Sequence, residues 1–251
     1  PGLETDALIN ALSGLENDTI AGKVTMRGLD HQSTLGAWVG ETALQNGRGV
    51  LRNWRFADGK DYMFSEAEVL ADGGITGLLI TSPVTAPAAI ARLASLAGRS
   101  AGLIATIDSP DVARRIAAAL AEAGTSLDVM IDIDPGIRRT GVASPEAAVE
   151  LAEAVAALPT LRLRGVQYYC GMQQHVEDYA ERRAAIVERT DYLKSIIAAL
   201  TEAGHAPEII SGSGTGTHRI DLDLGVFTEL QTGSYALMDK QYLDCDLIGD
   251  A

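Results

Sequence analysis

Four short segments combine glycine with polar or charged side chains, and each follows or ends an apolar run that reads as a strand. They are residues 135–141 (PGIRRTG), 170–175 (CGMQQH), 211–218 (SGSGTGTH) and 233–235 (GSY). In parallel α/β folds, the loops at the carboxyl ends of the strands carry the binding and catalytic groups. We therefore expect these four segments to form one site.

The segment 212–217 (GSGTGT) has the composition of an anion-binding turn. Glycines let the backbone amides approach an anion closely, and serine and threonine hydroxyls add donors. A phosphate site after the seventh and eighth strands is a recurrent feature of β/α barrels. The turn therefore predicts a phosphate site, although a surface turn has the same composition; its predicted residues are Ser213, Gly214, Thr215 and Gly216.

Two further loops carry side chains suited to an organic ligand. Arg138 and Arg139 follow a strand that bears Asp132 and Asp134. An arginine there can bind a carboxylate, a phosphate or a ring nitrogen, whereas solvent exposure is the commoner fate of arginine. In the next loop, aromatic and amide side chains precede His175 and suit the floor of a cofactor site; they are Tyr168, Tyr169, Gln173 and Gln174.

Alternating short strands and alanine-rich helices must position these loops. Strands are predicted at residues 75–81, 102–107, 127–134, 163–169, 207–211 and 227–237. Helices are predicted at residues 65–74, 87–96, 111–123, 145–157 and 176–203. Strict alternation of this kind indicates a parallel sheet with right-handed crossovers.

The first 64 residues have a weaker pattern. Residues 3–12 and 34–44 are predicted helices, residues 19–27 are a predicted strand, and another strand ends at Phe64. These two strands bring the total to eight, and eight β/α units in about 250 residues suit a TIM-type (β/α)8 barrel. An open doubly wound sheet is the alternative, but no GxGxxG follows the first strand.

Composition limits the partners and the compartment. The formal net charge of −14 disfavours nucleic acid and anionic membranes as partners. No apolar run is long enough to span a bilayer, and no signal peptide opens the chain. The cysteines, Cys170 and Cys245, form no disulfide framework and indicate a reducing, cytoplasmic location. Asp244, Cys245 and Asp246 are adjacent in sequence and are not predicted to bind a metal.

Five segments in this order resemble the fold-type III pyridoxal-phosphate (PLP) enzymes with an alanine racemase-like barrel, within them the D-threonine aldolase and D-serine dehydratase group. They are residues 65–75 (SEAEVLADGGI), 132–142 (DIDPGIRRTGV), 165–175 (GVQYYCGMQQH), 211–217 (SGSGTGT) and 229–239 (ELQTGSYALMD). The resemblance runs from about residue 65 to residue 246 and implies one PLP-binding barrel domain over residues 1–251, with residues 1–64 weakly matched.

The resemblance implies roles for individual residues. Arg139 matches the family arginine of a GxxRxG turn, which reaches the cofactor, and Tyr169 and Gln174 match a YxGxxQH segment beside the cofactor ring. The phosphate would lie on the turn at Ser213–Gly216, closed by the end of the last strand at Gly233, Ser234 and Tyr235. His175 and His31 are the candidate proton-transfer residues.

The chain departs from the family pattern in two places. The family binds PLP through a lysine in a segment like RxHxKxHK, whereas alignment on His31 places Leu29 at the lysine position. None of the four lysines (Lys23, Lys60, Lys194 and Lys240) matches that position. The family also continues into a C-terminal β-domain with metal ligands, which we expect to be absent from this chain, so that a divalent metal is expected only where that domain is present.

The resemblance implies a PLP-dependent lyase that cleaves D-3-hydroxy amino acids into glycine and an aldehyde, in the manner of a D-threonine aldolase. Dehydratase-type elimination from D-serine or 3-hydroxyaspartate is the alternative. A non-catalytic PLP-binding barrel without the lysine is a further alternative, and a different phosphate-binding barrel enzyme would also suit the glycine turn. A D-amino acid is the expected small-molecule substrate, and relatives of this kind imply a homodimer.

Overall fold

The computed structural model describes residues 15–19, 22–25, 37–45, 48–57, 66–236, 238 and 240–249. The chain divides into two compact units, Pro1–Ile75 and Thr76–Ala251. The assignment of all 251 residues to one PLP-binding domain remains a prediction. Among the described residues, no helix has the length and apolarity needed to cross a bilayer.

The described residues of the first unit form two antiparallel strand pairs and a helix. Strand β1 (Glu16–Thr19) pairs with β2 (Gly22–Thr25), and β3 (Ala37–Gln45) pairs with β4 (Arg48–Ala57). Helix α3 (Glu66–Asp72) follows, as predicted for residues 65–74.

Two predictions for this unit were wrong. Residues 34–44 were predicted as a helix, but Ala37–Gln45 is a strand. The sequence Asn46-Gly47 separates it from its partner strand and is a strong hairpin signal, which outweighs the helix-favouring residues of the strand. Residues 19–27 were predicted as the first barrel strand, but Gly22–Thr25 pairs antiparallel with its sequence neighbour. The predicted helix at residues 3–12 and the end of a strand at Phe64 lie outside the described residues.

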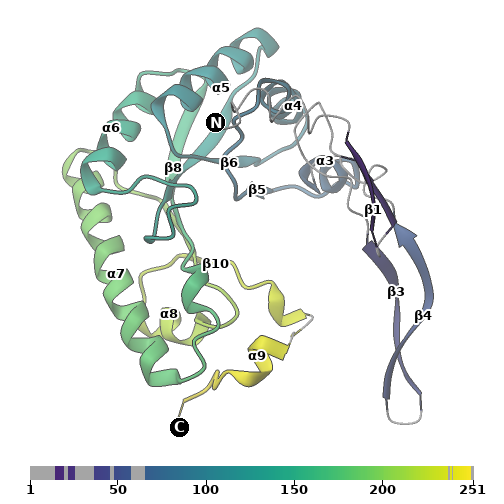
Figure 1. The fold of residues 1–251 in the computed structure, drawn as a ribbon. Helices are drawn as coiled ribbons and strands as arrows, with labels where there is room; N and C mark the ends of the chain where they lie inside the picture. The colour runs from purple at the N-terminus through teal and green to yellow at the C-terminus, as the bar shows by residue number, and fades with distance from the viewer. Residues whose placement is uncertain are drawn as a thin grey trace, which may run out of the picture. The chain divides into compact units, whose positions relative to one another are not determined.

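The second unit is a parallel sheet of six strands in the order β10-β9-β8-β7-β6-β5 (Figure 1). Its strands are β5 (Leu79–Ile80), β6 (Ile104–Ile107), β7 (Leu127–Ile133), β8 (Leu161–Tyr168), β9 (Ile209–Gly212) and β10 (Glu229–Leu230). The intervening helices are α4 (Pro87–Ala97), α5 (Pro110–Ala123), α6 (Pro145–Ala156), α7 (Tyr179–Glu202) and α8 (His218–Leu224). The predicted alternation of strands and helices is confirmed here.

The last predicted strand is shorter than expected. Residues 227–237 were predicted as one strand, but β10 ends at Leu230 and a 3-10 turn, η2 (Ser234–Ala236), follows. The chain turns at Gly233, whose carbonyl accepts a hydrogen bond from the amide of Ala236 at 3.2 Å. Helix α9 (Lys240–Asp244) lies near the end of the chain.

The sheet is curled, so that its described part forms a half-barrel. The side-chain amide of Gln167 on β8 donates to the carbonyl of Thr81, just after β5, at 2.8 Å. In a flat sheet three strand spacings amount to roughly 14 Å, which a glutamine side chain cannot span. The curl agrees with the predicted barrel class, of which the described sheet contains six strands.

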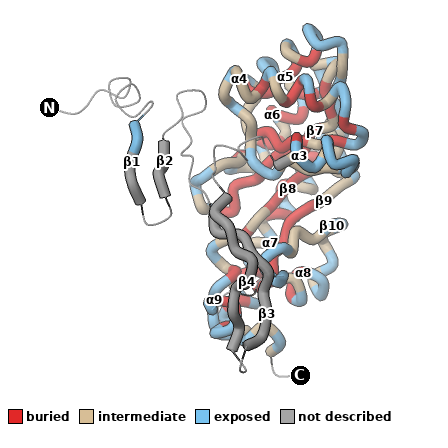
Figure 2. Tube along the Cα trace, turned by 90° about the vertical axis from the view of Figure 1, so that its right-hand side faces the viewer, coloured by how far each residue is buried: buried red, intermediate tan, exposed pale blue. Residues whose placement is uncertain are grey.

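The helices begin at well-defined caps and cover an apolar core. The hydroxyls of Ser109 and Ser144 accept from the third residue of α5 and α6 at 3.2 Å, and both helices have proline in their first turn. The core includes Ile107, Ile116 and Ile131, each with 0% exposure. Strands β7 and β8 are largely buried, while the helices expose their outer faces (Figure 2). This packing holds in place the carboxyl ends of the strands, from which the loops of the site extend.

Candidate functional site

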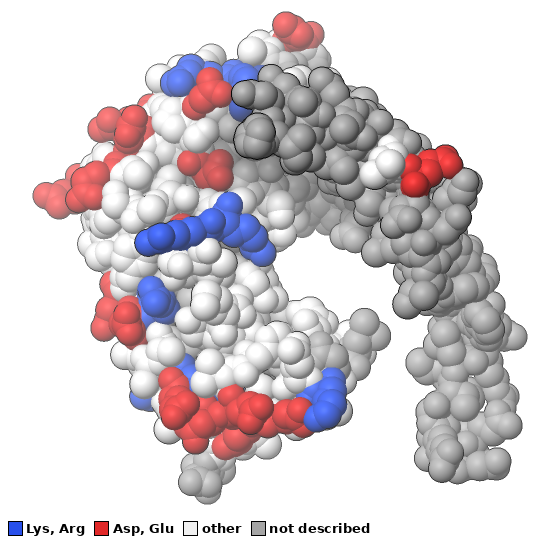
Figure 3. Space-filling view, in the orientation of Figure 1, with Lys and Arg blue, Asp and Glu red and all other residues white. Residues whose placement is uncertain are grey.

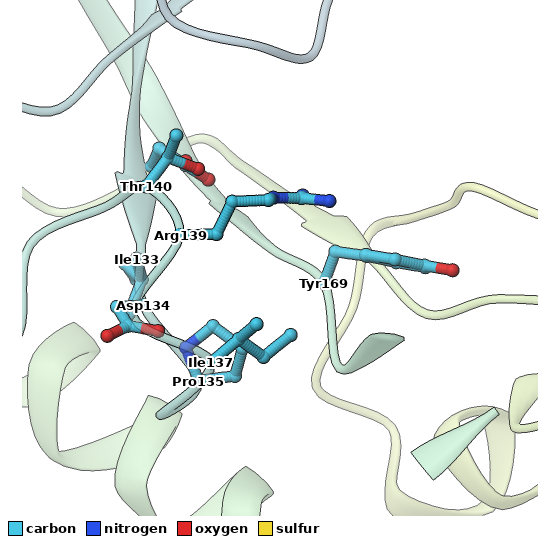
Figure 4. Close-up of a pocket in the computed structure, with 8 residues that line it drawn as sticks. Ile133, Asp134, Pro135, Ile137, Arg139, Thr140 and Tyr169 are labelled. Carbon is cyan, nitrogen blue, oxygen red and sulfur yellow. The ribbon is translucent and has the colours of Figure 1, made fainter. Parts of the chain in front are cut away.

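A small pocket lies at the carboxyl end of β7 (Figure 4). The side chains of Arg139 and Tyr169 extend from neighbouring loops on the same side of it. A cation and an aromatic ring therefore share one wall. The pocket is lined by Asp132, Ile133, Asp134, Pro135, Ile137, Arg139, Thr140 and Tyr169.

The loop that carries Arg139 is held closed by backbone and side-chain hydrogen bonds. The carboxylate of Asp134 accepts from the amides of Gly136 at 2.9 Å and Arg138 at 3.0 Å. Arg138 has a positive φ of 58°, and a Cβ on Gly141 would lie 2.4 Å from the backbone nitrogen of Asp134. Only glycine fits at position 141, which explains part of the GxxRxG pattern.

Asp132 is a buried carboxyl on the wall of this pocket, with 5% exposure. Burial raises its pKa, and the negative charge of Asp108 adds to that effect. Hydrogen bonds from Thr140 and Gln167 and the positive charge of Arg139 act in the opposite direction. The protonation of Asp132 therefore depends on its hydrogen bonds with Thr140 and Gln167 and on the charges of Asp108 and Arg139.

The loop after β8 connects this pocket with the helix near the chain end. The rings of His175 and Tyr242 lie 4.4 Å apart, centroid to centroid. Burial raises the pKa of Tyr169, and nearby Tyr242 raises it further, whereas Arg139 lowers it. Tyr242, on α9, thus belongs to the same cluster as Tyr169 and His175. Of these residues, His175 is exposed.

The glycine turn after β9 is built around the side chain of Gln174, which has 0% exposure. Its Oε1 accepts from the amide of Gly216 at 2.9 Å, and its Nε2 donates to the hydroxyl of Thr217 at 3.1 Å and to the carbonyl of Cys170 at 3.2 Å. A Cβ on Gly216 would lie 1.9 Å from the carbonyl oxygen of Gln174. The turn at Gly216 is therefore in direct contact with both the backbone and the side chain of Gln174.

Two buried side chains lie together here, Ser213 in the turn and Asp221 on α8, and each residue is 3% exposed. Burial raises the pKa of Asp221, while Thr217, Ser213 and His218 lower it. Ser213 has a positive φ of 69°, a conformation associated with anion-binding backbone turns.

The last predicted segment joins the same turn. The amide of Tyr235 donates to the hydroxyl of Thr215 at 3.0 Å, which ties η2 to the turn. Gly233, Ser234 and Tyr235 are exposed there. The structure thus groups Gln174, Ser213–Gly216 and Gly233–Tyr235 at one place. Arg139 lies on the loop after β7, and Tyr169 and His175 lie on the loop after β8. His31 lies outside the described residues.

Two residues near these loops, Tyr242 and Gln167, were not predicted to belong to the site. The strand that carries Gln167 also contains Arg162 and Arg164, so its polar character gave no distinct signal for Gln167. Tyr242 had none, because its contact with His175 bridges 67 positions of sequence. Among the described residues, no group of three histidine, cysteine or carboxylate side chains is arranged to hold a metal ion.

The curled parallel sheet and the loops at its strand ends place the chain in a family: residues 62–241 match the alanine racemase N-terminal domain, and the chain belongs to that family. Its first 61 residues lie outside the match.

Three relatives show which branch the chain resembles. A 3-hydroxy-D-aspartate aldolase of Paracoccus denitrificans (strain Pd 1222) is 40% identical over 178 residues, which cover 71% of this chain and 46% of the relative. A crystal structure of D-threonine aldolase from Filomicrobium marinum has 40% identity and a TM-score of 0.70, and covers 72% of this chain and 49% of that one.

The third relative is D-threo-3-hydroxyaspartate dehydratase from Delftia sp. HT23, with 27% identity and a TM-score of 0.62 over 71% of this chain and 47% of that one. The chain thus spans about half the length of the relatives it matches.

Proposed function

We propose that this chain contributes the PLP-binding half-barrel of a lyase that cleaves D-3-hydroxy amino acids to glycine and an aldehyde. The observation that carries the proposal is the pairing of two features on adjacent loops. A cation and an aromatic ring, Arg139 and Tyr169, line one pocket, and a Gln174-anchored glycine turn lies next along the sheet. The similar aldolases support this assignment.

The residues present fit PLP at both ends of that molecule. The backbone of the glycine turn suits a phosphate dianion, and the close approach of Gly214 and Gly216 to Gln174 keeps the turn in shape. The guanidinium of Arg139 suits the ring nitrogen, and the Tyr169 ring suits the pyridine face. The exposed arginines locally offset the net charge of −14; Figure 3 shows basic side chains grouped in the middle of a face whose acidic band lies near α9.

When bound, PLP supplies an electron sink for the pair left at Cα when a bond to Cα breaks. In the proposed cleavage the Cα–Cβ bond breaks, the β-hydroxyl loses its proton as the aldehyde forms, and Cα gains a proton to give glycine. His175 is our candidate to accept a proton, because it is exposed and its ring lies 4.4 Å from that of Tyr242, which interacts with Tyr169. His31 remains a second candidate by prediction.

Two alternatives have support of their own. The dehydratase relative favours elimination of water. Non-covalent PLP binding is favoured by the described lysine side chains, because Lys194 pairs with Asp191 on α7 and Lys240 with Asp244 on α9. A divalent metal, a homodimer and a cytoplasmic location remain predictions.

An absorbance spectrum of the chain with added PLP, followed by borohydride reduction and intact mass, tests the covalent form. D-threonine is then supplied and glycine, acetaldehyde and 2-oxobutanoate are measured. We expect the intact mass to show a PLP adduct. We also expect D-threonine to give glycine and acetaldehyde in equal amounts. Formation of 2-oxobutanoate would favour the dehydratase, and reversible PLP binding without product would favour the non-catalytic alternative.

A further inference from the structure

Four buried or half-buried polar side chains form a ladder across the concave face of the sheet. Asp132 on β7 pairs in register with Gln167 on β8, which pairs with Ser211 on β9. Residues in register on parallel strands point to the same face, so these three side chains lie at one level. The register partner of Ser211 on β10 is Glu229, and Gln231, two residues further along, reaches the Ser211 hydroxyl through its side chain. A TIM-type barrel fills such a layer with bulky apolar residues, and its polar character here requires an explanation.

The hydrogen bonds of the ladder fix the orientation of each amide. Gln167 Nε2 donates to the Thr81 carbonyl at 2.8 Å and to Oδ1 of Asp132 at 3.0 Å, so its oxygen must face the other way. That oxygen accepts from Nε2 of Gln231 at 3.3 Å, and the same nitrogen donates to Oγ of Ser211 at 2.9 Å. Gln167 is 3% exposed and uses its two donors and its acceptor within the protein.

The ladder ends at Asp132, which lines the pocket beside Arg139. The glycine turn, by contrast, is held by Gln174, whose hydrogen bonds go to Cys170, Gly216 and Thr217. The side-chain hydrogen bonds of Gln167 and Gln174 share no partner. Two buried glutamines therefore support two ends of the site separately.

We propose that Gln167 is a positioning residue that holds the Asp132–Arg139 wall for the ring of a bound pyridoxal-type ligand, independently of the phosphate turn. This inference rests on the proposed function, because it needs the pyridine ring to lie beside Arg139. Gln167 acts through Asp132 and does not itself touch the ligand.

The test separates the two ends with three probes that cannot form a covalent bond to lysine. Pyridoxine carries the ring, inorganic phosphate the anion, and pyridoxine 5′-phosphate both. Binding to the full chain is measured by equilibrium dialysis for wild type, Gln167→Leu, Gln174→Leu and the exposed control Gln241→Leu.

We expect Gln167→Leu to weaken pyridoxine binding about tenfold and to leave phosphate binding within about twofold. Gln174→Leu should show the opposite selectivity, and Gln241→Leu neither effect. Equal loss of both probes in Gln167→Leu, or no loss of pyridoxine binding, would overturn the inference while the proposed function stands. A wild-type chain that binds none of the probes would overturn both.

A second variant separates positioning from folding. In Gln167→Glu the new carboxyl lies next to Asp132, near Asp108 and Arg139, and can donate only when it is protonated. Pyridoxine affinity relative to wild type should therefore recover as the pH falls, when it is measured at pH values at which urea unfolding shows the variant to be fully folded. A ratio that does not change with pH would show that the loss in the leucine variant reflects folding, and would also contradict the proposal.

Discussion

At the scale of single residues, the site depends on close packing between the glycine turn and Gln174. Gln174 is surrounded by the turn it holds, and glycines at 214 and 216 are required because a Cβ at either position would collide with that glutamine. The glycines of the GSGTGT segment thus serve packing as well as access for an anion.

Gly216→Ala should remove phosphate binding and lower the free energy of unfolding by about 1–3 kcal/mol, because its Cβ meets the Gln174 backbone at 1.9 Å. Urea unfolding and phosphate dialysis measure the two effects. Gly98→Ala is the matched control, since its Cβ would meet only the Ser95 carbonyl at 3.6 Å. Near-wild-type behaviour of the Gly216 variant would show that the turn is looser than described.

Arg139→Ala should raise the pKa of Asp132 further, because the arginine charge is one of the influences that lower it. Carbon-13 NMR of the aspartate carboxyls, with Asp132 assigned by an Asp132→Asn variant, follows the titration. Arg138→Ala provides the control, since Arg138 is exposed and does not line the pocket. An unchanged titration in Arg139→Ala would place the guanidinium away from Asp132.

At the scale of elements, a buried arginine joins the start of α7 to the segment after α9. Arg182 has 0% exposure and donates to the backbone carbonyls of Val176, Glu177 and Asp246. Its guanidinium also lies 5.5 Å from the ring centroid of Tyr179. This clamp holds the chain close to Tyr242 and therefore supports the His175 side of the site.

Arg182→Met should lower the free energy of unfolding by about 3 kcal/mol, because it leaves three carbonyls without that donor. It should also expose residues 240–249 to proteolysis before the rest of the second unit unfolds. Arg183→Met, at the exposed neighbouring position, should do neither. Equal protease resistance of the two variants would refute the clamp.

At the scale of the whole molecule, buried carboxyls make stability depend on pH. The folded-state pKa of Asp221 lies above the ordinary value of 3.8, so the folded chain binds more protons than the unfolded chain between the two values. The free energy of unfolding therefore falls as the pH rises through this window, by about 1.4 kcal/mol for each pH unit that separates the two pKa values.

Asp221→Asn should remove that contribution and flatten the pH dependence of urea unfolding above pH 4, whereas Asp223→Asn, exposed on the same helix, should keep the wild-type slope apart from the loss of one charge. Identical slopes in the two variants would mean that Asp221 titrates normally in the folded chain.

The secondary structure of the second unit was predicted well because the hydrophobic periodicity and the residues that mark the ends of helices and strands agree there. Serine caps followed by proline mark α5 and α6, and polar loops follow apolar strands. The antiparallel pairing of Gly22–Thr25 had no comparable signal, since pairing partners are chosen by tertiary context. The hairpin at Asn46-Gly47 was predictable in principle from its turn residues.

In the candidate site, too, some residues could be predicted from the sequence and others could not. Arg139, Tyr169 and the glycine turn lie in loops with distinctive local composition, so a resemblance could identify them. The roles of Gln167 and Tyr242 arise from contacts across 86 and 67 positions, with Thr81 and His175, and depend on how far the sheet curls. No local pattern encodes that curl.

A nitrogen-15 NMR titration of the full chain with pyridoxine 5′-phosphate, followed at the assigned backbone amides, tests directly whether these strand ends bind the cofactor. We predict saturable shifts at Ser213–Gly216 and at Arg139 and Thr140, with little change on the outer faces of α5 and α6. No saturable shift, or shifts confined to those outer faces, would contradict the assignment of these strand ends as a PLP site.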